Sequence, residues 1–131
     1  MTLVLDATVV MDACLANDGF AIFGREPLTA PPLLWPEVRS ALHQTLWRGE
    51  IDRGLARTAL DRLVSAPVRP SSPARLGIGA WETADEFGWA KTYDAEYVAL
   101  ARILGCRLVT LDAALLRATA RLGFVVALRE V

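Results

Sequence analysis

The sequence is poor in the residue types on which several common kinds of site depend. Its 131 residues include one histidine, His43, and two cysteines, Cys14 and Cys106. A single histidine without a nucleophile motif nearby argues against a Ser-His-Asp or Cys-His catalytic group. No Cys/His spacing suits zinc. Both cysteines lie in apolar stretches, which predicts buried, reduced core residues and not a disulfide.

Long apolar runs and phosphate-binding glycine loops are also missing. Although 53% of the residues are hydrophobic, no uninterrupted apolar run approaches the roughly 18 residues needed to cross a bilayer. The beginning of the chain has no basic region and carries Asp6 and Asp12, so it does not resemble a signal peptide. We therefore expect a cytoplasmic protein without a membrane partner.

Neither a Rossmann nor a Walker glycine motif occurs, so the phosphate-binding loops of both kinds are missing as well.

The charge balance restricts the possible partners only weakly. The net charge is −1, which excludes a globally basic nucleic-acid binder. All of the basic residues except Lys91 are arginine, the better bidentate ligand of phosphate. A GC-rich genome explains an arginine-rich chain equally well. Charge alone neither establishes nor excludes an RNA partner.

Hydrophobic periodicity predicts strands that alternate with helices. We expect strands at 3–5, 106–110 and 124–128, and helices at 8–16, 36–48, 52–64, 74–87, 93–104 and 112–121. Segment 17–32 is predicted to be mostly loop with a short helical turn, and proline-rich segment 66–73 to be an edge strand or a connector. The alternation predicts one domain, residues 1–131, built as a three-layer α/β/α sandwich around a central parallel sheet.

Four acidic residues stand at the boundaries of these predicted elements. Asp6 and Asp112 follow two strands, and Glu37 and Asp94 lie near the starts of two apolar helices. In an open α/β sheet, the carboxyl ends of the strands and the helix starts that follow them share one crevice. Carboxylates crowded there repel one another, so their natural use is to hold a hard divalent cation. Phosphodiester cleavage is the leading chemistry for such a site.

Helix capping is the competing explanation for each acid taken singly. Asp is a favoured N-cap, and the helix dipole favours an acid in the first turn. Capping explains one acid at a time, however, and not the repetition of a strand followed by Asp at Asp6 and Asp112. Asp12 lies on a different face of its predicted helix. The four tryptophans are expected to pack in the core by default, with a partner surface as the alternative.

Four segments of the chain resemble the PIN-domain family, and more narrowly the VapC-type ribonuclease toxins of bacterial toxin–antitoxin pairs. These segments are DAT at 6–8, PEVRSAL at 36–42, YDAEYVALA at 93–101 and LVTLD at 108–112. The resemblance covers about residues 3–126, and YDAEYVALA followed by the strand before Asp112 is its most specific part.

The resemblance implies an Mg²⁺- or Mn²⁺-dependent endoribonuclease that forms a homodimer and is neutralised by a cognate antitoxin. It assigns catalysis and metal binding to Asp6, Glu37, Asp94 and Asp112, and places hydroxyl side chains beside them at Thr8, Ser40 and Thr110. We expect an activated water to attack the phosphate, and Arg39 and Lys91 to hold the RNA backbone. Some PIN domains have a further acid after the last Asp; here Ala113 follows, which leaves a second metal open.

Two other readings of the sequence remain. A phosphotransfer enzyme of the haloacid-dehalogenase type needs a second Asp at position 8, which is Thr8, and a receiver needs a lysine after the last strand, where the chain has Ala127 to Arg129. A catalytically silent PIN-like protein that only binds a partner would lack some of the acids, but all four are present.

Overall fold

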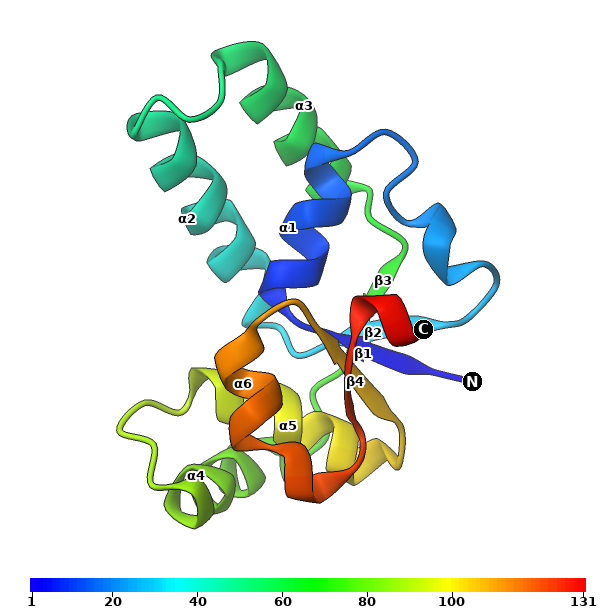
Figure 1. Cartoon of the computed structure of the whole chain (residues 1–131), viewed down its shortest axis with the longest axis vertical. Coiled ribbons are helices and arrows are strands. Elements are labelled where there is room, and N and C mark those ends of the chain that lie inside the picture. The colour runs from blue at the N-terminus through cyan, green and yellow to red at the C-terminus, as the bar shows by residue number, and fades with distance from the viewer.

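A parallel sheet of five short strands forms the centre of the molecule (Figure 1). The computed structural model describes residues 1–131. The strand order is β3-β2-β1-β4-β5, and every neighbouring pair is parallel. The strands are β1 (Leu3–Leu5), β2 (Leu28–Ala30), β3 (Val68–Pro70), β4 (Arg107–Thr110) and β5 (Val125–Ala127). Because all five run the same way, their carboxyl ends meet at one edge of the sheet.

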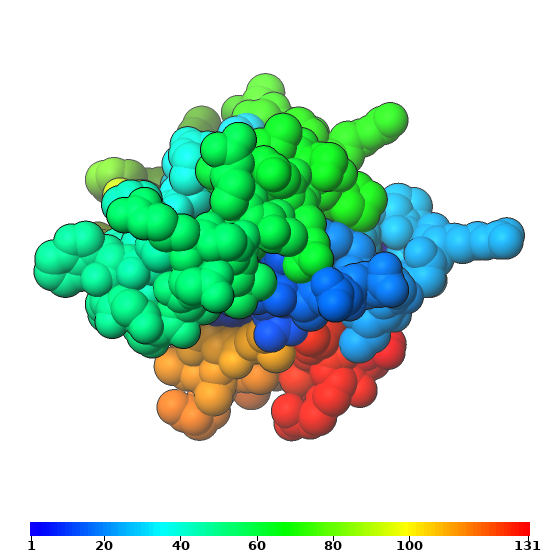
Figure 2. Space-filling view, turned by 90° about the horizontal axis from the view of Figure 1, so that it is seen from above, coloured from blue at the N-terminus to red at the C-terminus, as the bar shows by residue number.

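Helices cover both faces of this sheet. On one face lie α1 (Ala7–Leu15), α2 (Leu34–Trp47) and α3 (Arg53–Val64), and on the other lie α4 (Leu76–Phe87), α5 (Tyr93–Leu104) and α6 (Ala113–Ala118) (Figure 1). The space-filling view shows α2 and α3, in cyan-green to green, over much of the first face, with α1 in blue beside them (Figure 2). The predicted α/β/α sandwich around a parallel sheet is confirmed.

The helices begin and end largely where the local sequence predicts. Asp52 caps α3 by accepting a hydrogen bond from the Leu55 amide at 2.7 Å. Helix α5 ends at Gly105, which has a left-handed backbone with φ 66°. A side chain is strained in that conformation, so glycine is favoured there. The bounds of α5 match the prediction exactly, and those of α1 and α3 differ from it by one residue at one or both ends.

Segment 17–32 is the one place where the predicted element order needs correction. The expected short helical turn is present as a 3₁₀ turn at Ala21–Phe23, but the segment also contains β2, which pairs with β1 on one side and β3 on the other. The three residues of β2 are too few to show an alternating pattern, and Pro31 and Pro32 follow them directly. Local turn signals therefore hid an internal strand, which is held by its pairing and its burial.

The C-terminal third departs less from the prediction. Helix α6 ends at Ala118, and the predicted remainder of that helix is a separate 3₁₀ turn at Ala120–Leu122. Segment 66–73 does supply an edge strand, β3, whose last residue is Pro70. Proline has no N–H to donate, and it is tolerated there because one side of an edge strand has no neighbouring strand that needs a donor.

The core is one cluster of 28 buried residues, to which both sheet faces contribute. Cys14 and Cys106 are buried and unpaired, as predicted. The default expectation for the tryptophans is wrong for two of them: Trp47 is 82% and Trp81 67% exposed, whereas Trp35 and Trp89 pack against the core. None of the helices has both the length and the apolar composition required to cross a membrane.

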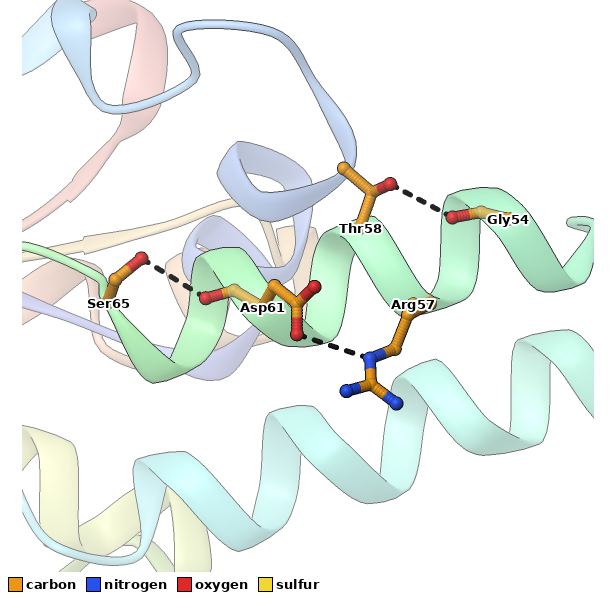
Figure 3. Close-up of polar contacts among 5 residues, drawn as sticks. All are labelled: Gly54, Arg57, Thr58, Asp61 and Ser65. Carbon is orange, nitrogen blue, oxygen red and sulfur yellow. Dashed lines mark hydrogen bonds and ion pairs between the residues drawn. The ribbon is translucent and has the colours of Figure 1, made fainter.

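The outer surface of α3 is stabilised locally. The Thr58 hydroxyl donates to the Gly54 carbonyl at 3.0 Å, the Ser65 hydroxyl to the Asp61 carbonyl at 3.1 Å, and Arg57 pairs with the Asp61 carboxylate at 3.2 Å (Figure 3). These are exposed contacts that contribute little to stability. They do show that the guanidinium of Arg57 already has an acidic partner.

Candidate acidic site

Asp6 is the buried anchor of the site. The fully buried strand β1 delivers it to the carboxyl edge of the sheet, where its side chain is 5% exposed. Its Oδ1 accepts the Val9 amide at 3.1 Å and so caps α1. The capping explanation is therefore correct as far as it goes, but it accounts for only part of what this carboxylate contacts.

Two threonine hydroxyls hold the same carboxylate from both sides. Thr8 donates to Asp6 Oδ1 at 2.6 Å, and Thr110, at the end of β4, donates to Asp6 Oδ2. Each hydroxyl also accepts a backbone amide: Thr8 that of Leu111 and Thr110 that of Asp112, both at 3.0 Å. Because each threonine donates to the acid and accepts from the loop after β4, the network joins Asp6 to the segment that positions Asp112.

Burial makes the negative charge of Asp6 costly. Removal of the carboxylate from water raises its pKa from 3.8 to about 6, even though the hydrogen bonds from Thr110, Thr8 and Val9 lower it. The charge of Asp94 raises the pKa further. A helix cap needs no such burial, since caps work equally well at the surface. The observed burial is what an acid with a buried binding partner would show.

Glu37 is positioned by a residue from the opposite helical layer. It lies in the first turn of α2, and its Oε1 accepts a hydrogen bond from the hydroxyl of Tyr97 on α5. Tyr97 is 1% exposed, so its ring is rigidly packed while its hydroxyl reaches the site. Burial raises the pKa of Glu37, and the charges of Asp94 and Glu96 raise it further, while the hydrogen bond from Tyr97 lowers it.

Asp94 and Asp112 complete the group. Asp94 lies in the first turn of α5, and Asp112 caps α6 by accepting the amides of Ala114 at 2.9 Å and Leu115 at 3.2 Å. Partial removal of the Asp94 carboxylate from water raises its pKa, and the charge of Asp112 raises it further. Asp94 in turn raises the pKa of both Asp6 and Glu37. Asp94 is thus the electrostatic centre of the four acids.

The chemistry of these side chains suits a hard divalent cation. Such ions bind carboxylate oxygens, and their charge offsets the mutual repulsion that raises the pKa values. Asp94 accepts no hydrogen bond, and Glu37 and Asp112 each keep one oxygen without a hydrogen-bond partner. No three His, Cys, Asp or Glu side chains stand in a ready metal-binding arrangement, however. Sharing one ion would therefore need rotamer changes, which the free oxygens of Asp94, Glu37 and Asp112 permit.

The other predicted site residues are placed unequally. Thr8 and Thr110 enter the hydrogen-bond network of Asp6. Ser40 is exposed on α2, one helical turn after Glu37, and makes no side-chain hydrogen bond, so its predicted place beside the acids stays a prediction. Arg39 and Lys91 are both exposed and have no ion-pair partner. Their predicted role in holding RNA stays a prediction.

Two residues near the acids were not singled out from the sequence. Tyr97 lies three residues after Asp94 on the same helix, and Glu96 lies two after it. The spacing of Asp94 and Tyr97 places both on one face of a helix, and a buried tyrosine hydroxyl needs a partner. Those two facts together were a usable signal for Tyr97. Glu96, half-buried and with a pKa raised by burial, had no comparable signal.

Comparison with known proteins shows which chains this one resembles. No family model matches the chain. Ribonuclease VapC9 of Mycobacterium tuberculosis is 34% identical over 112 residues, which are 84% of this chain and 85% of that protein. Ribonuclease VapC1 of the same species is 38% identical over 119 residues, 86% of each chain. The crystal structure of PAE2754 from Pyrobaculum aerophilum superposes with a TM-score of 0.78 at 26% identity, covering 99% of this chain and 91% of that one.

Proposed function

The chain belongs to the VapC family of PIN-like ribonucleases, and from that premise we propose that it cleaves RNA at the cluster of Asp6, Glu37, Asp94 and Asp112. One observation carries the assignment of the site. Acids from four separate segments gather at the carboxyl edge of the sheet, and Asp94 raises the pKa of two of them while Asp112 raises that of Asp94. Such an accumulation of negative charge is costly unless a cation binds there.

We propose Mg²⁺ or Mn²⁺ as that cation, held directly by Asp6 and Asp94, with Glu37 and Asp112 completing the site directly or through water. When bound, the ion supplies Lewis acidity, which activates water and offsets the charge that develops on the scissile phosphate. Use of water as the nucleophile leaves 3′-hydroxyl and 5′-phosphate ends. The only histidine, His43, is exposed and lines a groove between α2 and α3, so nothing places it among the acids.

The protein's own residues orient the acids for this reaction. Thr8 and Thr110 hold the plane of the Asp6 carboxylate, and Tyr97 holds one oxygen of Glu37. These donors leave Asp6 Oδ2 with one further lone pair and Glu37 Oε2 with both. Both carboxylates are therefore held in place and can still bind a ligand. Mutation of residues that orient metal ligands in this way typically lowers metal affinity or activity by about 10- to 100-fold.

We further propose that the protein is a toxin that acts in the cytoplasm as a homodimer and is restrained by a cognate antitoxin. The family supports this proposal, and the exposed apolar surface is available for protein contacts. Trp47, at the end of α2, is 82% exposed.

The test is a cleavage assay with end-labelled RNA. The wild-type protein should cut internally in Mg²⁺ and not in EDTA, and Asp94→Asn should abolish cutting at every Mg²⁺ concentration. Asp12→Asn is the matched control, because Asp12 is an exposed acid on α1 outside the cluster. Products should carry 5′-phosphates, detectable by ligation. Cleavage that survives both EDTA and Asp94→Asn would refute the assigned site, and RNA binding without cleavage would favour a partner-binding role.

A further inference from the structure

A second cleft lies at the same edge of the sheet as the acids. It is bounded by the segments that follow β2 and β3, by the first half of α4 and by the start of α5, and has a volume of about 520 Å³. Helices α4 and α5 pack side by side below the sheet (Figure 1). Glu96 links the cleft to the acids, because it lines the cleft and its charge also raises the pKa of Glu37.

An uncovered aromatic ring forms part of this cleft. The Trp81 side chain is 67% exposed, although tryptophan carries enough apolar surface to favour burial. Gly77 stands one helical turn earlier on the same face of α4, and a Cβ built there would meet no atom within 4 Å. Glycine at position 77 presents no side chain on this face, and the exposed indole is open to a flat ligand.

Three polar side chains line the same cleft without a hydrogen-bond partner in the protein. They are the hydroxyls of Ser72 and Thr92 and the carboxylate of Glu96. A flat apolar face beside hydrogen-bond donors and acceptors is the combination with which proteins bind an unstacked base of single-stranded RNA. Lys91, exposed and directly before Thr92, stands where a cation could meet the adjoining phosphate.

We propose that this cleft binds one unstacked nucleobase of the RNA substrate, with Trp81 as the stacking platform and Glu96 as the acceptor that selects bases carrying an amino group. The proposal rests on the proposed ribonuclease function and adds a specificity site to it. A carboxylate accepts hydrogen bonds from the amino groups of cytosine, adenine and guanine. Uracil has no amino group and offers only its single ring N3–H as a donor, so it should be the weakest ligand.

The test measures RNA binding separately from cleavage. Asp94→Asn serves as the parent protein, and fluorescence anisotropy in Mg²⁺ gives its affinity for short oligo-A, oligo-C, oligo-G and oligo-U. Adding Trp81→Ala should weaken binding about tenfold, whereas Trp81→Phe should keep most of the affinity. Trp47→Ala is the matched control, since Trp47 is an exposed tryptophan at the far end of α2. Glu96→Gln should reduce the preference against oligo-U.

The outcomes separate this proposal from the one on which it rests. If wild type cleaves RNA but Trp81→Ala binds as well as its parent, or loses no more than Trp47→Ala, the base site is refuted and the ribonuclease stands. A change in oligomeric state caused by Trp81→Ala alone, measured by light scattering, would assign the ring to a subunit contact and overturn the proposal. If wild type neither cleaves nor binds RNA, the function itself fails.

Discussion

The sharpest prediction concerns the charge that the fold holds at Asp6. Replacing Asp6 by Asn should abolish RNA cleavage and yet stabilise the metal-free protein near neutral pH. The carboxylate is 5% exposed, and its pKa is raised from 3.8 to about 6. The unfolded chain releases this proton near pH 4, while the folded protein keeps it until about pH 6. Ionisation therefore favours unfolding, and stability is lost as the pH rises between those two values.

The magnitude follows from the width of that pH window. Each pH unit corresponds to about 1.4 kcal/mol, so a window of roughly two units lowers the free energy of unfolding by about 3 kcal/mol above pH 6. Asn keeps an acceptor for Val9 and Thr8, but its amide cannot accept from Thr110. Loss of that hydrogen bond costs about 1 kcal/mol. The free energy of unfolding of Asp6→Asn should exceed that of the wild type by about 2 kcal/mol at pH 7.5. At pH 4 the variant should be no more stable than the wild type.

Urea denaturation in EDTA measures this difference directly. The wild type and Asp6→Asn are compared at neutral and acidic pH, and the difference between them is followed so that general effects of acid cancel. Asp12→Asn, an exposed acid on the same helix, should change stability by less than about 0.5 kcal/mol at either pH. A stability difference for Asp6→Asn that does not depend on pH would refute the argument that a buried charge is responsible. A destabilised variant at neutral pH would refute it as well.

Three further substitutions test the residues around the acids. Tyr97→Phe keeps the buried ring but removes the donor that lowers the pKa of Glu37, so the pH profile of cleavage should shift to higher pH and kcat should fall about tenfold; an unchanged profile would remove Tyr97 from the site. Thr110→Val leaves Asp6 Oδ2 and the Asp112 amide without a partner and should cost about 1–3 kcal/mol. Thr58→Val on the exposed surface of α3 should cost much less, and equal costs would contradict the network. Glu86 pairs with Arg102 and Arg121, both at 3.0 Å on the surface, so Glu86→Gln should cost less than about 1 kcal/mol and the cost should vanish in high salt.

The fold was predictable where a segment carries its own periodic signal. Helix α5 carries a strongly apolar stretch and ends at a glycine, and both of its bounds were predicted from the sequence. Strand β2 was not predictable in this way. It is three residues long, two prolines follow it, and its identity comes from pairing with β1 and β3. Thr29 in this strand is buried, and no local pattern predicts its burial.

The site residues also differ in whether a local sequence signal could predict them. Asp6 and Asp112 could be found from the sequence because each follows a recognisable strand, and the strands prove to be neighbours in the sheet. Their assigned roles stay predictions. The contact between Glu37 and Tyr97 joins residues 60 positions apart in opposite helical layers, and only tertiary structure brings them together. The predicted place of Ser40 beside the acids stays a prediction, since no hydrogen bond joins it to them.

The free-energy cost of holding a negative charge differs among the acids, and the fold stabilises each charge in a different way. Asp112 caps α6 by accepting two backbone amides, and these amides and the helix dipole stabilise its negative charge. Asp6 is buried, and its three hydrogen bonds do not restore an ordinary pKa. Partial burial raises the pKa of Asp94, the charge of Asp112 raises it further, and the charge of Asp94 in turn raises the pKa of Asp6. A bound cation would lower the raised pKa values of Asp6 and Asp94 together, so Mg²⁺ should stabilise the wild type most where Asp6 is ionised, above about pH 6.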